Sequence, residues 1–309
     1  MKNKIKNLIN NYERYGASGV LKFYFENKMF GEQIKLNTIT LAKCLTNDFL
    51  NFSSINLFVK KFSAYFHIIP KVSIIMSVYN GEPFLRESID SILSQDFKDF
   101  EFLIMDDGSA DGSYAILKEY ARKDKRIKIF RNEENLGLTK SLNLLLKHSK
   151  GLFIARMDSD DVSLQRRLRI EYEFLTRNSN IFLVGTRVFH IDSKRETIAH
   201  PILPTSSLEI SDLLPKTNCI YHPTIMFRNE EYNYREKFLY AQDYDFYLNL
   251  LSAGKNFYNL KDTLLLYRIT NDSLSKRKGQ KQKEFADKAR TFYFERIEKG
   301  TDSYDSFTL

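Results

Sequence analysis

The chain has 309 residues, 43% of them hydrophobic and 28% charged, a balance that excludes an intrinsically disordered protein. Its two cysteines, Cys44 and Cys219, show neither CxxC spacing nor a Cys/His cluster, which argues against a disulfide framework and a zinc site. The net charge of +8 comes without a recognisable nucleic-acid module, so we expect no nucleic-acid partner.

Residues 1–69 are predicted to form an accessory segment with short amphipathic runs. No run reaches the roughly 18 apolar residues that cross a bilayer, because Lys60 and Lys61 interrupt the most hydrophobic stretch, 49–69. The amino terminus is basic but lacks the apolar core of a signal peptide. We therefore expect a cytoplasmic protein.

From Pro70 onward, short apolar runs alternate with segments of helical periodicity. The runs are near-continuously apolar, as expected for strands that are buried on both faces, and they cover residues 72–78, 100–105, 127–130 and 152–155. The segments between them repeat apolar residues every three or four positions. This alternation predicts a doubly wound, mostly parallel sheet with helices on both faces.

Each predicted strand is followed by Asn or Asp, at Asn80, Asp106, Asp107, Asn135, Asp158, Asp160 and Asp161. In doubly wound sheets, ligands bind beyond the carboxyl ends of the strands. We therefore interpret these residues as one rim of a polar cleft, although loops are generally polar as well.

The run ARMDSDD places Asp158, Asp160 and Asp161 directly after the fourth strand. Carboxylates at these positions can converge on one magnesium or manganese ion, since both prefer oxygen ligands. An Asp-rich turn without a metal is the alternative. We expect Asp160 and Asp161 to be exposed at the strand end.

Asp106 and Asp107 allow two interpretations. In one, the segment caps the next helix, with Asp111 or Ser109 accepting amide hydrogen bonds. In the other, a carboxylate accepts the ring N–H of a uracil. The fingerprints GxGxxG and GxxxxGK[ST] are both missing, so a dinucleotide oxidoreductase and a P-loop NTPase lose their main support.

Taken together, several blocks of the chain resemble the family 2 glycosyltransferases, bacterial inverting enzymes of the GT-A fold. The blocks span residues 71–275, about two thirds of the chain, and read VSIIMSVYNGEPFLRESIDSILSQ, FEFLIMDDGSADGS, NLGLTKSLN, ARMDSDD, YHPTIMFR and QDYDFYLNLLSAG. The resemblance implies a nucleotide-sugar donor, usually UDP-linked, in a GT-A fold.

The resemblance also implies roles for individual residues. Those around the nucleotide are Ser77, Val78, Tyr79 and Asp107, and we place Asp106, Asn135 and Asp158 on the same side. Asp158, Asp160 and Asp161 match the metal motif, and Asp243 matches the general base. The chain departs from the family at Gln242, where Glu is common, and at Thr270, often His. His222 could face the acceptor, although a lone His is more often structural.

A helix is expected from about Asp243 to Ser252. Residues two apart on a helix point in nearly opposite directions, so Asp243 and Asp245 cannot both face an acceptor. We predict that Asp243 is the base and that Asp245 lies in solvent; a merely capping Asp243 is the alternative.

The predicted organisation is an accessory segment 1–69, a nucleotide-sugar half 70–205, an acceptor half 206–275 and a basic helical tail 276–309. The function expected is transfer of a sugar, with inversion of configuration, from a nucleotide-sugar donor to a glycan or lipid-linked saccharide in surface glycan biosynthesis. A nucleotidyltransferase and a catalytically inactive sugar-nucleotide-binding module are the alternatives. The basic stretch 276–283 suggests peripheral association with an anionic membrane surface, with a solvated loop as the alternative.

Overall fold

The computed structural model describes residues 69–270 and 279–308. They belong to one unit, Pro70–Leu309. Most of the predicted accessory segment, 1–68, and the first part of the basic stretch, 276–278, lie outside the described residues.

The first half of the described chain forms the four parallel strands that the sequence predicts. They are β1 (Val72–Val78), β2 (Phe100–Asp107), β3 (Ile127–Asn132) and β4 (Phe153–Met157), and they pair in the order β3-β2-β1-β4. Asp106 and Asp107 are the last two residues of β2. Strand β3 differs from expectation: it lies at the edge of the sheet, and much of it is partly or fully exposed.

The second half extends the same sheet with strands β5 (Val162–Ser163), β6 (Ile181–Ile191), β7 (Thr197–Ala199), β8 (Met226–Arg228) and β9 (Asn256–Arg268). Strand β8 is antiparallel to both β4 and β6, and β9 is parallel to β6. Strands β6 and β9 therefore run in the same direction as β1 to β4. The carboxyl ends of these six strands all point toward one edge of the sheet. The sheet as a whole is mixed, because it contains parallel and antiparallel pairs.

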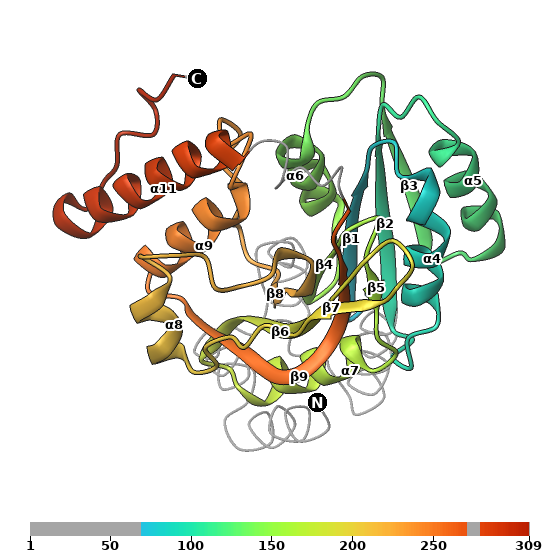
Figure 1. Ribbon diagram of the computed structural model, residues 1–309, viewed down its shortest axis with the longest axis horizontal. Coiled ribbons are helices and arrows are strands. Elements are labelled where there is room, and N and C mark those ends of the chain that lie inside the picture. Colours follow the sequence, from blue (N-terminus) through green and yellow to red (C-terminus); the bar gives the residue numbers. More distant parts are fainter. Residues whose placement is uncertain (1–68, 271–278, 309) are drawn as a thin grey trace, which may run out of the picture. The chain divides into compact units, whose positions relative to one another are not determined.

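Helices cover both faces of the sheet, as predicted (Figure 1). One face carries α4 (Glu82–Leu93), α5 (Ser113–Lys123) and α7 (Arg167–Arg177), and the other carries α6 (Leu138–His148), α8 (Ser207–Leu213), α9 (Gln242–Ser252) and α11 (Gly279–Lys299). Alternation along β1 explains the two layers: Ile74 and Met76 enter the first core, and Ile75 enters the second. No helix in the described parts of the chain is long and apolar enough to cross a membrane.

Candidate active site

The acidic turn after β4 brings three carboxylates together. Asp158, Asp160 and Asp161 each offer one oxygen, and these oxygens lie within 4.8 Å of one another. The turn is fixed from two sides. The Ser88 hydroxyl on α4 donates to the Asp158 carbonyl at 2.8 Å, and the Arg268 amide on β9 donates to the Asp161 carboxylate at 2.8 Å. The residues that were predicted to share a metal are therefore brought together, and we call them the acidic turn.

Burial and mutual repulsion act on these carboxylates. Burial, followed by the charge of Asp158, raises the pKa of Asp160 to about 6. Burial, followed by the charges of Asp160 and Asp158, raises the pKa of Asp161 well above its ordinary value. Asp161 is only 1% exposed, so the prediction that it lies open at the strand end is wrong: its side chain turns inward to accept the β9 amide. Its second oxygen, Oδ2, is buried without a hydrogen-bond partner among the described residues.

Arg156 is a buried cation beneath the acidic turn that the sequence analysis did not single out. It lies in β4, is 2% exposed, and its guanidinium pairs with both carboxylate oxygens of Asp158. Its Nε is buried without a hydrogen-bond partner within the described parts of the chain. A signal was available in the sequence, because an Arg inside an apolar strand pattern needs a partner when it is buried.

Asp243 lies in the first turn of α9, as predicted, and is partly exposed. Its Oδ2 accepts a hydrogen bond of 2.9 Å from the Asn218 side-chain amide. Burial raises the pKa of the Asp243 carboxyl, and a hydrogen bond from the Tyr244 amide and the charge of Arg156 partly offset this effect. Arg156 therefore influences Asp243 as well as Asp158, which places both acids around one buried cation.

Asp245 does not lie in solvent, so that prediction is wrong. Its carboxylate is fully buried and pairs with Arg235, which in turn pairs with Asp302 at 2.6 Å. Asp245 therefore ties α9 to the segment that follows α11. The separation of the two acids was expected; the burial of the second was not, because its partners lie 10 and more residues away along the chain.

On the nucleotide side, Asp107 holds the loop that follows β3. It is 2% exposed, and it accepts hydrogen bonds from the Asn132 side chain at 2.7 Å and from the amides of Leu136 and Gly137 at 2.9 Å each. Gly108 lets this loop approach closely, since a Cβ there would lie 2.6 Å from the Glu134 carbonyl carbon. The Asp107 carboxylate is thus a structural acceptor for this strand end.

Asp106 is fully buried, and its Oδ2 lies 3.1 Å from Arg131 Nε. Arg131 itself stacks over the Tyr114 ring, with 4.1 Å between guanidinium carbon and ring centroid. Asp111 accepts from the Ser113 amide at 3.0 Å, and Ser109 accepts from the Asn80 amide. These contacts brace the ends of β1 and β2 against each other. The N-cap position of α5 is Gly112, which has no side chain to cap the helix.

The other predicted nucleotide residues differ in how accessible they are. Ser77 is partly exposed, Val78 is fully buried, and Tyr79 is 51% exposed. Asn135 is exposed and accepts a hydrogen bond from the Gly137 amide at 3.0 Å. Of these side chains, that of Tyr79 is the large apolar group most open to a ligand.

His222 is in the interior and not on the surface of the site. Its ring is 7% exposed and its Nε2 lies 2.8 Å from the Tyr234 hydroxyl. Burial, followed by the charge of Arg156, lowers the His222 pKa well below its ordinary value, so the ring is neutral. Thr270 follows the end of β9 by two residues.

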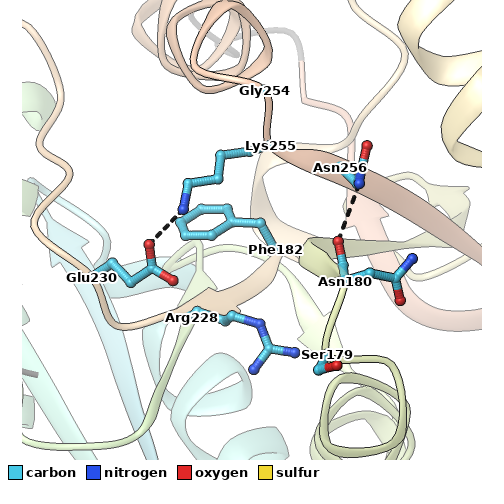
Figure 2. A pocket seen from close by; sticks show the side chains of 8 residues that line it. All are labelled: Ser179, Asn180, Phe182, Arg228, Glu230, Gly254, Lys255 and Asn256. Carbon is cyan, nitrogen blue, oxygen red and sulfur yellow. Dashed lines mark hydrogen bonds and ion pairs between the residues drawn. The ribbon is translucent and has the colours of Figure 1, made fainter. Parts of the chain in front are cut away.

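A hollow of about 100 Å³ lies at the opposite edge of the sheet, near the beginnings of β6 and β9 (Figure 2). Its charged groups are paired: Lys255 bonds Glu230 at 2.6 Å, and Arg228 donates to backbone carbonyls including that of Ile181 at 2.9 Å. This hollow is remote from the predicted catalytic residues, and its groups are engaged in holding strand ends together.

Comparison with known proteins places the chain among enzymes that transfer sugars. The model of the family described as Glycosyl transferase family 2 matches residues 73–234. The chain is 37% identical to the O-antigen biosynthesis glycosyltransferase WbnJ of Escherichia coli over 216 residues, covering 68% of this chain and 84% of WbnJ.

Solved structures share the fold. The S. aureus TarS structure in complex with UDP-GlcNAc matches with a TM-score of 0.55 and 20% identity, covering 74% of each chain. The mannosyltransferase PcManGT from Pyrobaculum calidifontis, in complex with GDP-Man and Mn2+, matches with a TM-score of 0.52 and 15% identity, covering 70% of this chain and 65% of that one. At these identities, the likeness concerns the fold alone.

Proposed function

Because the chain belongs to glycosyl transferase family 2, we propose that it transfers a sugar, with inversion of configuration, from a nucleotide-sugar donor to an acceptor hydroxyl. A UDP-sugar is the first candidate for the donor. One observation carries the proposal: a crowded acidic turn and the separate acid Asp243 flank the buried Arg156 at the carboxyl edge of the sheet. The reaction needs two such acidic groups, one to hold the metal ion that contacts the diphosphate and one to accept the proton of the acceptor hydroxyl.

The acidic turn fits a divalent cation, manganese or magnesium. Its three carboxylates supply hard oxygen ligands, and the raised pKa values of Asp160 and Asp161 show that their negative charges lack sufficient compensation. The unpartnered Asp161 Oδ2 points to the same need. Asp158, Asp160 and Asp161 would hold the ion, which when bound would neutralise charge on the diphosphate leaving group. The structural neighbour PcManGT was solved in complex with Mn2+, which is consistent with this choice.

Asp243 is the proposed general base. It takes the proton of the acceptor hydroxyl while that oxygen bonds to the anomeric carbon and the nucleoside diphosphate departs from the opposite side. A pKa raised by burial brings the carboxylate closer to the working pH and makes it a stronger base. The Asn218 amide holds one carboxylate oxygen in place.

The nucleotide is proposed to lie over the ends of β1, β2 and β3, with Ser77, Tyr79 and Asn135 accessible to it. Asp106 and Asp107 hold the neighbouring segments of this region in place through their buried contacts with Arg131 and Asn132. The acceptor is proposed to be a growing surface glycan, free or lipid-linked. The name of WbnJ, an O-antigen biosynthesis enzyme, supports this class.

The deciding experiment is a panel of UDP-, GDP- and dTDP-sugars, assayed for release of nucleotide with Mn2+, with Mg2+ and with a chelator. We expect metal-dependent hydrolysis of one donor class, and tight binding of its nucleotide diphosphate in calorimetry. Binding without turnover, even when simple glycosides are added as acceptors, would favour an inactive binding module. Absence of both binding and turnover would contradict the proposal.

We also propose that the tail associates with an anionic membrane surface. Lys281 and Lys283, the described lysines of the basic stretch, are exposed at the start of α11. Each basic residue near such a surface contributes about 1 kcal/mol, and salt screens this attraction. Sedimentation with vesicles of phosphatidylglycerol should exceed that with phosphatidylcholine and should fall as salt rises; equal sedimentation would exclude the association.

A further inference from the structure

Three partly exposed aromatic side chains, His190, Tyr221 and Tyr267, meet beside the acidic turn, and we call them the aromatic cluster. Their ring centroids lie 5.4–5.5 Å apart in all three pairings. The His190 Nε2 lies 2.8 Å from the Tyr221 hydroxyl, which fixes both rings. Burial lowers the His190 pKa, so its ring is neutral near pH 7.

Register places this cluster at the carboxyl edge of the sheet. His190 and Tyr267 are paired residues on β6 and β9, each one position before its strand ends. Tyr267 is flanked by two residues that contact the acidic turn or the strand after it. Leu266 pairs with Val162, and Arg268 donates its amide to Asp161. The aromatic cluster and the acidic turn are therefore neighbours.

The order of the strands also shows on which side of β4 the aromatic cluster lies. Strands β3, β2 and β1 lie on one side of β4, and β8, β6 and β9 lie on the other. With the nucleotide over β1 to β3 and the acidic turn after β4, the cluster lies on the side away from the nucleotide. An acceptor must approach from that side, since the leaving group departs on the other.

The chemistry of the cluster suits a sugar ring. A pyranose presents an apolar face of C–H groups and a rim of hydroxyls. Aromatic rings offer flat apolar area, and Tyr and His add polar edges that exchange hydrogen bonds. Ligand sites typically combine apolar, aromatic walls with a few fixed polar groups. Tyr221 and Tyr267 pack against the core, yet all three rings stay partly exposed and are accessible in part to a ligand.

We propose that His190, Tyr221 and Tyr267 form a platform on which the acceptor's terminal pyranose ring stacks. The platform orients the acceptor hydroxyl for attack and restricts acceptors to those with an accessible apolar sugar face. This assignment rests on the proposed function, because only a glycosyl acceptor needs a second sugar-binding surface beside the acidic turn. The experiments below separate the two.

A tryptophan reporter tests binding directly, because the chain contains no Trp. Tyr267→Trp keeps an aromatic face in the cluster, and Tyr258→Trp is the matched control, a partly exposed Tyr near the other end of the same strand. Methyl glycosides of glucose, galactose, mannose and N-acetylglucosamine are titrated with and without UDP and Mn2+. We expect a saturable emission change from at least one glycoside at position 267 and none at position 258.

Emission at position 267 that no glycoside changes would overturn the platform. Calorimetric binding of UDP to the same samples reports on the proposed function separately: a protein that binds UDP but shows no glycoside response has its donor site and lacks the platform. A protein that responds to glycosides but binds no nucleotide diphosphate retains the platform and contradicts the proposed donor.

A kinetic split tests orientation. With the best glycoside as acceptor, Tyr221→Ala should raise the acceptor KM at least tenfold, and Tyr221→Phe, which keeps the ring, should raise it less than threefold. The affinity for UDP with Mn2+ should change less than twofold in both. If UDP affinity and acceptor KM deteriorate together in Tyr221→Ala, the ring supports the acidic turn and the platform assignment is wrong.

Discussion

Two groups of aspartates lie at the ends of β2 and β4, the two strands that flank β1, and their carboxylates have opposite environments. Asp107, at the end of β2, accepts three hydrogen bonds from the loop after β3, and Asp106 lies against Arg131. In the acidic turn after β4, Asp160 and Asp161 repel each other and Asp158. The sequence motifs DDGS and DSDD look alike, yet only the second leaves charge uncompensated.

This difference indicates where a ligand contributes. A buried carboxylate that its own chain satisfies holds the backbone in place, whereas crowded carboxylates are unfavourable until a cation or a proton joins them. Such unfavourable arrangements persist where function requires them. The predictions that follow test this contrast, beginning with the acid that is proposed to react.

The largest effect is expected for Asp243→Asn. The amide keeps the shape of the side chain but cannot take a proton, so the transfer rate should fall by on the order of a hundredfold or more. The affinities for UDP and Mn2+ should stay within about twofold of wild type in calorimetry, because the acidic turn, and not Asp243, is proposed to bind the metal. Transfer at nearly wild-type rate would show that Asp243 only caps α9.

The matched control is Asp245→Asn, two residues along the same helix. Since Asp245 is buried against Arg235, this variant should lose stability in thermal unfolding and not donor binding. A folded Asp245→Asn protein that has lost only transfer would move the base to that position.

In the acidic turn, Asp160→Asn should weaken Mn2+ binding in the presence of UDP by on the order of a hundredfold, since even indirect partners of a metal ligand contribute 10- to 100-fold. Without metal, the same variant should unfold at a temperature about 2–4 °C higher, because removing one of three crowded charges relieves repulsion of roughly 1 kcal/mol. Calorimetry and thermal unfolding measure the two effects. A destabilised metal-free variant would refute the crowding argument.

At the end of β2 the change in unfolding temperature should have the opposite sign. Asp107→Ala leaves the Asn132 amide and the amides of Leu136 and Gly137 without their acceptor, at a cost of about 3 kcal/mol. The unfolding temperature should drop by roughly 6–12 °C with or without Mn2+. If Asp107→Ala instead raised this temperature, the two aspartate groups would not differ in the way described.

Much of this arrangement could be predicted from the sequence, and the exceptions share a cause. The ends of β1 agree to the residue, because a near-continuous apolar run and Pro70 are local signals. The burial of Asp161 depends on Arg268, 107 residues later, and that of Asp245 depends on Arg235 and Asp302. Such long-range partners leave no local pattern.

The aromatic cluster illustrates the same limit. Its members come from β6, from the residue before the short helix η2 (His222–Thr224) and from β9, and only the register of the sheet unites them. Arg156, by contrast, directly follows the predicted apolar run 152–155, so a cation at the end of a buried strand was visible in the sequence. Partners could be assigned to it only once the structure showed Asp158 above it.

The pH dependence sharpens the contrast further. The Asp160 pKa of about 6 exceeds its ordinary value of 3.8, so between these pH values the folded protein binds more protons than the unfolded chain. The contribution of Asp160 to metal-free stability is therefore present at low pH and is lost as the pH rises through about 6. Because Mn2+ requires the ionised carboxylate, its affinity should fall about tenfold between pH 7 and pH 5.

Asp160→Asn is the control for this titration. The stabilisation of the metal-free variant relative to wild type should be larger at pH 7 than at pH 5, and it should vanish only near pH 4 and below, where Asp160 is protonated in the folded and the unfolded chain alike. Unfolding temperatures of both proteins across this range provide the measurement. An equal difference at both pH values would show that the crowding of charges is not its source.

The smallest effect is expected for Asp106→Asn, the residue next to Asp107. The substituted side chain still offers an oxygen to the Ser109 amide, 3.4 Å away, but loses the attraction to Arg131. Arg131 is half exposed and stays stacked over Tyr114, so water can solvate its charge, and the loss should be about 1 kcal/mol. The unfolding temperature should drop by about 2–4 °C, and UDP affinity should change less than twofold.

Arg131→Gln is the matched control, because it removes the other partner of the ion pair. If the ion pair is the only connection between the two residues, the double variant should be no less stable than Asp106→Asn alone. A loss of UDP affinity of tenfold or more in Asp106→Asn, at unchanged stability, would instead identify Asp106 as the carboxylate that contacts the nucleotide base, and would place a ligand-binding acid within the group that we describe as satisfied by its own chain.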